Sequence, residues 1–173
     1  MDELESHRSR DLSAAREVRF ADVFSPDRIQ IGIKVSSAKR MLEVVSGLLA
    51  NNSDDAVDED VVFRTLLERE HLGSTCVGNG VALPHGRLDN IQTPIGAIMC
   101  METPLKMDAI DDKPVDLVCA LVVPANARDE HIELLRKLAE GIERYSLDHR
   151  IRNAASCSEV YLELAKLDGP API

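Results

Sequence analysis

The stretch LVCALVV, from Leu117 to Val123, is apolar at every position, and IGAIMCM, from Ile95 to Met101, has the same character. A strand with one face in water alternates apolar and polar residues, whereas a strand covered on both faces is apolar throughout. The two runs therefore predict strands in the middle of a sheet, with helices packed on each side. Pro124 has no backbone N–H and is expected to end the second strand.

Helical and extended patterns surround these two runs. The segment IQIGIKV, Ile29 to Val35, alternates isoleucine with other residues and predicts a further strand. Ser36 or Ser37 then offers the N-cap of a helix, whose apolar residues recur at helical spacing. These residues are Ala38, Met41, Leu42, Val45, Leu48 and Leu49.

Three more helices are predicted along the chain. One carries Val61 to Leu66 and ends near His71, with Gly73 in the position that often follows a helix. Another begins at Asn126 or Asp129, and the last runs from Ser156 or Ser158 to Gly169. This arrangement predicts a single-domain α/β sandwich, a β-sheet flanked by helices on both faces, over residues 18–170. Residues 1–17 are polar and predict an arm without a core of its own.

Composition excludes several classes of protein. The chain has 173 residues and is 45% apolar, with three Phe, two Tyr and no Trp, so its core must be aliphatic. The net charge of −10 argues against binding to nucleic acid or to anionic membranes. No signal peptide or membrane-spanning run is visible, and the four cysteines form no C-x-x-C pair. We therefore expect a cytoplasmic protein with reduced thiols and no membrane insertion.

The stretch GSTCVGNGVALPHG, Gly73 to Gly86, contains four glycines and presents His85 directly behind a proline. Asn79-Gly80 is typical of a hairpin turn, and the VAL that follows predicts a short strand ending at Pro84. His85 would then lie at a strand end, with Gly86 leaving room for a ligand or a partner protein. The simpler interpretation is two tight turns without function. The glycine spacing matches no nucleotide-binding motif.

A histidine presented in this way is a candidate nucleophile, because a neutral imidazole exists near neutral pH. If it attacks phosphorus, the site also needs N–H donors or cations to hold the phosphoryl oxygens. Arg69 lies at the end of the second helix and His131 in the first turn of the third, and both are candidates. Each also has an ordinary interpretation, as a cation at a helix C-terminus and as a surface histidine.

The segment from Arg69 to Gly86 resembles the active-site stretch of the type-2 IIA domains of the bacterial phosphoenolpyruvate-dependent phosphotransferase system. The similarity covers nearly all of residues 18–169. The segment from Met101 to Ala125 is most similar to the nitrogen-regulatory branch. The resemblance implies a mixed sheet, a phosphotransferase in the sense of a histidine phosphocarrier, and no cofactor or metal.

The resemblance also implies roles for individual residues. His85 would accept a phosphoryl group from a small histidine phosphocarrier protein and form a tele-phosphohistidine, while His131 and Arg69 would assist the transfer. Candidates for further contacts to the phosphate are Ser74, Asn79 and Gly80. Cys76 stands where the family is expected to have glycine, and a buried, unreactive thiol is the expectation there.

Several functions remain open at this point. The nitrogen-type similarity favours a regulator whose phosphorylation state is read by target proteins, whose identity the sequence does not give. The alternative is a IIA component that feeds separate fructose- or mannitol-type transport components. A binding module that is never phosphorylated, and a metal site built from His85, His131 and Cys76, are further alternatives, and no local ligand spacing supports the last.

Overall fold

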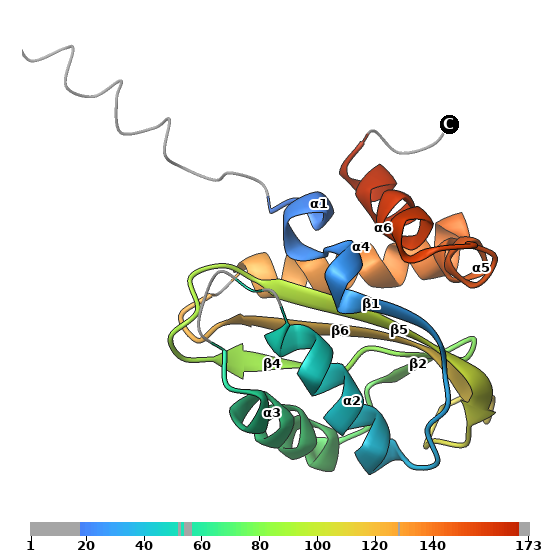
Figure 1. The fold of residues 1–173 in the computed structure, drawn as a ribbon, viewed down its shortest axis with the longest axis horizontal. Coiled ribbons are helices and arrows are strands. Elements are labelled where there is room, and N and C mark those ends of the chain that lie inside the picture. The colour runs from blue at the N-terminus through green and yellow to red at the C-terminus, as the bar shows by residue number, and fades with distance from the viewer. Residues whose placement is uncertain (1–17, 52, 54–56, 128, 170–173) are drawn as a thin grey trace, which may run out of the picture.

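A computed structural model of the protein describes residues 18–51, 53, 57–127 and 129–169, apart from the side chains of Glu130 and His131. The predicted arm, residues 1–17, lies outside the described residues. Figure 1 shows one α/β domain in which a mixed sheet lies between helices. Among the described residues, no helix is both long and apolar enough to cross a membrane.

The sheet has six strands in the order β1-β5-β6-β3-β2, with β4 also pairing with β6. The β5–β6 and β2–β3 pairs are antiparallel, and β1–β5, β3–β6 and β4–β6 are parallel. The strands are β1 (Ile29–Ile33), β2 (Cys76–Gly78), β3 (Val81–Ala82), β4 (His85–Leu88), β5 (Ile95–Leu105) and β6 (Val115–Pro124).

The prediction of two central strands is confirmed by β5 and β6, which pair with each other in the middle of the sheet. Both faces of β6 are buried, and its alternate residues enter two separate cores. Val118, Ala120 and Val122 belong to one core. Leu117, Cys119, Leu121 and Val123 belong to the other. This double burial explains why the strand has no polar face.

The helices divide between the two faces (Figure 1). Helices α2 (Ala38–Ala50) and α3 (Glu59–Leu72) cover one core. Four helices cover the other, namely α1 (Phe20–Val23), α4 (Asp129–Tyr145), α5 (Leu147–Arg152) and α6 (Cys157–Ala165). Two 3-10 turns, η1 (Pro26–Arg28) and η2 (Lys166–Asp168), complete the described elements.

The predicted caps are present at two helices. The Ser37 hydroxyl accepts a hydrogen bond from the Arg40 N–H at the start of α2. The Ser156 hydroxyl does the same for Glu159 at the start of α6. The short helices α1 and α5 were not predicted, because a helix of four or six residues is too short to show a periodic pattern.

The segment around Pro84 differs from its prediction. The chain does not leave the sheet after the VAL strand, because β3 ends at Ala82 and a new strand, β4, starts at His85. Both strands run parallel to β6, with His85 opposite Leu121. Pro84 lacks the N–H that would continue the ladder, but its carbonyl still accepts a hydrogen bond from the Leu121 N–H at 3.0 Å. His85 therefore occupies the start of β4 rather than the predicted end of the preceding strand.

Candidate functional site

His85 is held by its own strand connection. The ring is half-buried, and its Nδ1 lies 2.7 Å from the carbonyl oxygen of Leu83. A carbonyl oxygen only accepts hydrogen bonds, so Nδ1 must carry the proton that is shared with it. In the neutral ring this arrangement leaves the lone pair on Nε2. The local backbone thus selects which nitrogen of His85 carries the proton and which keeps the lone pair.

The surroundings of His85 favour its neutral form. Burial of the ring lowers the pKa of His85 below its ordinary value of 6.5. The positive charge of Arg69 lowers the pKa further, while the bond to Leu83 and the charge of Glu70 oppose these effects. At neutral pH the imidazole is therefore uncharged and able to act as a nucleophile.

Helix α3 brings Arg69 to this region by packing directly on the start of β4. A β-carbon added to Gly86 would lie only 2.7 Å from Cγ2 of Thr65, so the helix and the strand pack closely here. Arg69 lies one turn further along α3 and is half-buried. Its Nη1 donates a hydrogen bond to the Gly73 carbonyl at 2.9 Å. This bond ties the arginine to the segment that follows the helix.

His131 is the third residue of α4, as predicted, but its side chain is not among those described. The start of α4 lies at the sheet end reached by β4, since Leu88 pairs with Pro124 at the end of β6. Nη1 of Arg87, two residues beyond His85, donates hydrogen bonds to the carbonyls of Ala125 and Ala127. The backbone therefore brings the beginning of α4 to the end of the sheet at which β4 terminates.

The predicted phosphate contacts at Asn79 and Gly80 are not brought beside His85. Val81 lies opposite Leu117 and His85 lies opposite Leu121, four residues further along β6, which is about 13 Å. The Asn79 N–H donates to Oδ2 of Asp111 instead. These two residues therefore belong to the opposite end of the sheet.

Gly80 has a structural reason to be glycine. Its φ is +75°, and an added β-carbon would lie 3.0 Å from Nη2 of Arg152 and 3.1 Å from the Pro114 carbonyl. Its carbonyl accepts hydrogen bonds from the N–H groups of Asp116 and Leu117. The turn is thus closed by the backbone at the start of β6 and by Arg152, and these contacts leave no room for a β-carbon at Gly80.

Ser74 also makes structural contacts. Its hydroxyl donates to the Asp108 carbonyl at 2.5 Å and accepts from the N–H of Cys76 at 3.2 Å. Cys76 itself is buried, and burial raises the pKa of its thiol. The thiolate needed for oxidation is therefore disfavoured, in keeping with the expected unreactive thiol.

Glu70 was not among the site residues predicted from the sequence. Its carboxylate accepts hydrogen bonds from the hydroxyl and the N–H of Thr75, at 2.6 and 3.3 Å. It also acts electrostatically on His85. The only signal in the sequence was its place next to Arg69, at the C-terminal end of a helix, where the macrodipole disfavours a carboxylate.

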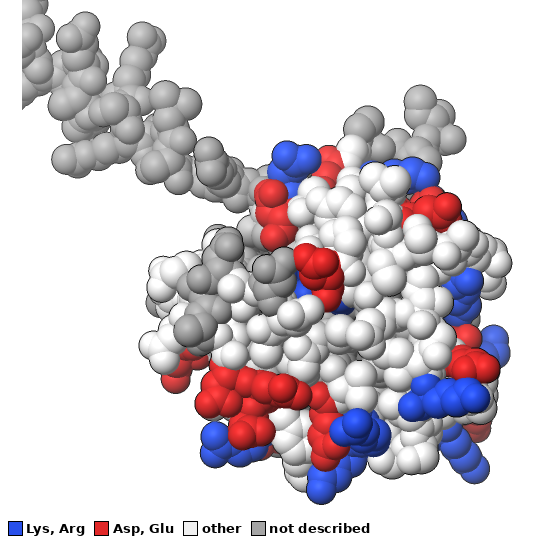
Figure 2. Space-filling model, in the orientation of Figure 1, with Lys and Arg blue, Asp and Glu red and all other residues white. Residues whose placement is uncertain are grey.

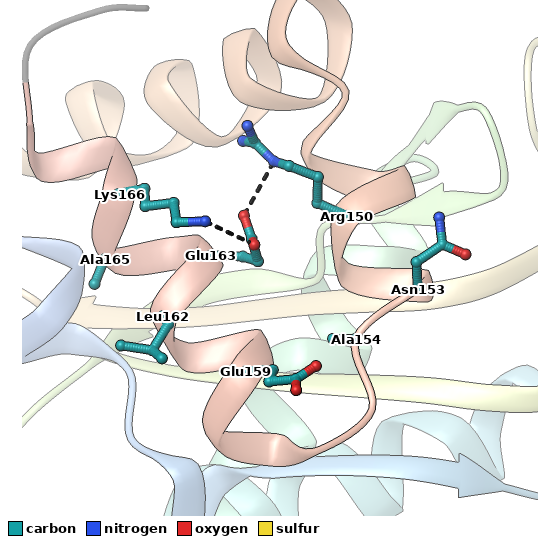
Figure 3. Close-up of a pocket in the computed structure, with 8 residues that line it drawn as sticks. All are labelled: Arg150, Asn153, Ala154, Glu159, Leu162, Glu163, Ala165 and Lys166. Carbon is teal, nitrogen blue, oxygen red and sulfur yellow. Dashed lines mark hydrogen bonds and ion pairs between the residues drawn. The ribbon is translucent and has the colours of Figure 1, made fainter.

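A separate groove of about 610 Å³ lies between α5 and α6 (Figure 3). Its charged side chains pair with one another, since Glu163 lies 3.2 Å from Arg150 and 2.9 Å from Lys166. None of the predicted site residues lines this groove. Among the described side chains, no three His, Cys, Asp or Glu residues gather as metal ligands. Figure 2 shows acidic side chains over the region of α3, interspersed with basic ones.

Comparison with known proteins assigns the family. The family model of the phosphoenolpyruvate-dependent sugar phosphotransferase system, EIIA 2, matches residues 22–166. A curated relative, the nitrogen regulatory protein of Pseudomonas aeruginosa, is 38% identical over 144 residues, which are 83% of this chain and 93% of that protein.

Two solved structures show the same fold. The nitrogen regulatory protein IIA-Ntr from Neisseria meningitidis has a TM-score of 0.77 and 37% identity, and the match covers 83% of this chain and 97% of that one. The IIA mannitol enzyme from Escherichia coli, solved in complex with phosphorylated IIB, has a TM-score of 0.68 and 22% identity, and the match covers 82% and 98% of the two chains. The chain therefore belongs to the EIIA 2 family of the phosphoenolpyruvate-dependent sugar phosphotransferase system, with similarity to its nitrogen regulatory members.

Proposed function

We propose that this protein is a histidine phosphocarrier in which Nε2 of His85 accepts a phosphoryl group from a small histidine phosphocarrier protein. The observation that carries the proposal is the 2.7 Å hydrogen bond from Nδ1 to the Leu83 carbonyl. This bond leaves the lone pair on Nε2, so the product is tele-phosphohistidine, in which phosphorus is bonded to Nε2. Membership of the family supports the same chemistry.

The transfer exchanges one P–N bond for another. The lone pair of Nε2 bonds to phosphorus while the bond between phosphorus and the donor's histidine nitrogen breaks, and that electron pair returns to the donor. As the new bond forms, positive charge develops on the His85 ring. The Leu83 carbonyl stabilises this charge through Nδ1–H, without any reorganisation during the reaction.

Arg69 and His131 are proposed to act on the phosphoryl oxygens. Arg69 already acts electrostatically on His85. A guanidinium has several N–H donors, of which the Gly73 carbonyl takes one. His131 is proposed as the second histidine because α4 begins at the sheet end that β4 reaches. Ser74, Asn79 and Gly80 are left out of the proposed site, since their described contacts are with other parts of the fold.

The phosphorylation state is proposed to be a signal. Phosphorylation adds nearly two negative charges and strong acceptor oxygens to the half-buried ring of His85. A partner that covers the bare ring with apolar or acidic groups then meets repulsion, whereas one that presents arginines gains hydrogen bonds. The similarity to nitrogen regulatory proteins favours this role over that of a sugar-transport component.

The chemistry is tested by incubating the protein with phosphoenolpyruvate, Enzyme I and candidate phosphocarrier proteins, followed by intact-mass measurement. The wild type should gain one phosphoryl group, in an adduct that is labile in acid and stable in base. His85→Ala should gain none, while the control His149→Ala, at an exposed position, should behave like the wild type. A base-labile adduct, or one that persists in His85→Ala, would overturn the assignment.

The signalling role needs a second experiment. Partners are captured from lysate on His85→Ala, on His85→Asp as an imperfect mimic of the charge, and on the enzymatically phosphorylated wild type. At least one partner should discriminate between the bare and charged forms. Equal retention of every partner, together with onward transfer of the phosphoryl group to a sugar-specific IIB protein, would favour the transport alternative.

A further inference from the structure

Glu70 is placed where a carboxylate needs a compensating partner. It lies in the last turn of α3, at the negative end of the helix dipole, and it is half-buried. Its partners come from Thr75, whose hydroxyl donates at 2.6 Å and whose N–H donates at 3.3 Å. One side chain thus accepts from both hydrogen-bond donors of a residue five positions later in the chain.

Thr75 connects this carboxylate to the strand that precedes His85. Thr75 is buried, and its carbonyl accepts a hydrogen bond from the Leu83 N–H at 2.9 Å. The carbonyl of the same Leu83 lies 2.7 Å from Nδ1 of His85. Glu70, Thr75, Leu83 and His85 therefore form an unbroken series of hydrogen bonds that starts on α3 and ends on the imidazole ring.

The side chain of Leu83 is buried in the core, and the described hydrogen bonds of its backbone N–H and carbonyl go to Thr75 and His85. Leu83 lies in the gap between β3 and β4, where the parallel ladder to β6 is interrupted, and is followed by Pro84, which has no N–H. The hydrogen bond from the Leu83 N–H to Thr75 therefore helps to set the direction in which the Leu83 carbonyl points. A small displacement of that carbonyl weakens its bond to Nδ1 and removes the preference for one tautomer.

We propose that Glu70 is a positioning residue for the phosphoryl transfer, acting through Thr75 and Leu83 to hold His85 in the tautomer whose Nε2 is the nucleophile. The expected effect on the transfer rate rests on the proposed function. The expected effect on the tautomer of His85 does not. The hydrogen bonds described for Glu70 go to Thr75, so an effect that is passed through Thr75 and Leu83 must be visible in the tautomer of the imidazole itself.

The test uses the full-length protein with ¹⁵N-labelled histidine. Correlation spectra of the ring nitrogens report the tautomer of His85, and phosphoryl transfer is timed separately. In the wild type, His85 should be almost entirely Nδ1–H. In Glu70→Ala it should become a mixture, and transfer should slow by about 10-fold to 100-fold, as expected for a slightly misplaced reacting group. Glu68→Ala is the control, because it removes an exposed carboxylate from the same helix.

A pair of variants at Thr75 separates positioning from general stability. Thr75→Ser keeps the hydroxyl that Glu70 binds, whereas Thr75→Val keeps the shape and loses it. Thr75→Ser should retain the wild-type tautomer and rate, and Thr75→Val should reproduce the Glu70→Ala effect. This pair decides the question even if Glu70→Ala fails to fold.

The inference is overturned if folded Glu70→Ala keeps the Nδ1–H tautomer and a transfer rate within about twofold of the wild type. Equal behaviour of the two Thr75 variants would overturn it as well. If the wild type accepts no phosphoryl group, the proposed function fails, whereas the tautomer measurement still decides whether Glu70 positions the ring.

Discussion

Gly86→Ala is expected to disturb the packing of α3 on β4 and, through it, the site. The added β-carbon would lie 2.7 Å from Cγ2 of Thr65, where an ordinary contact between carbons is about 3.5–4.0 Å. One of the two groups must therefore move by about 1 Å. Thr65 cannot simply rotate away, because its χ1 is restricted and its hydroxyl donates to the Val61 carbonyl at 2.8 Å.

The expected cost follows from this geometry. Overpacking of a close contact typically destabilises a protein by about 1–3 kcal/mol. At about 2 kcal/mol, the midpoint of thermal unfolding of a domain of this size should fall by about 4–8 °C. Because Arg69 lies one turn beyond Thr65 on the same helix, a shift of α3 also changes its position relative to His85. Phosphoryl transfer should therefore slow as well.

Thr65→Ser provides the matched second change. It removes Cγ2, with which the new methyl group would clash, and keeps the hydroxyl that bonds to Val61. The free energy of unfolding by urea and the transfer rate are measured for the wild type, both single variants and the double variant. The double variant should recover most of the stability lost in Gly86→Ala, with an interaction energy of about 1–2 kcal/mol. Additive effects, or a Gly86→Ala protein as stable as the wild type, would refute the close packing of α3 on β4.

The pH at which the transfer rate falls to half should lie below 6.5, because burial and Arg69 lower the pKa of His85 and the protonated ring has no lone pair on Nε2. In an NMR titration, Arg69→Gln should raise that pKa. Arg152→Ala should lower the free energy of unfolding by about 3 kcal/mol in urea, since it leaves the buried Asp148 carboxylate without its 2.7 Å partner, and an unchanged value would contradict this. Asp168→Ala removes both acceptors of the N–H groups at the start of α1, so limited proteolysis at that helix should accelerate, whereas Asp168→Asn should keep one acceptor and show a smaller effect.

The two apolar runs were enough to predict the centre of the fold. Burial on both faces leaves no polar alternation, so Leu117–Val123 and Ile95–Met101 could be placed mid-sheet without knowledge of their partners. Local signals also narrowed the N-caps of α2 and α6 to one of two nearby serines each, and the structure has Ser37 and Ser156, because capping depends on residues within one helical turn. The short helices α1 and α5 carry no such periodic signal.

Within the site, the sequence by itself singled out His85 and Arg69, through the glycine-rich stretch and its resemblance to a family. It also offered Asn79 and Gly80 as candidates for phosphate contacts, although the strand register places the neighbouring Val81 about 13 Å from His85, toward the start of β6. The sequence did not show Glu70 as a partner of Thr75. Register, and the packing of α3 on β4, depend on contacts between residues far apart in the chain. Only the tertiary structure could therefore decide which residues surround the imidazole and which nitrogen of His85 carries its proton.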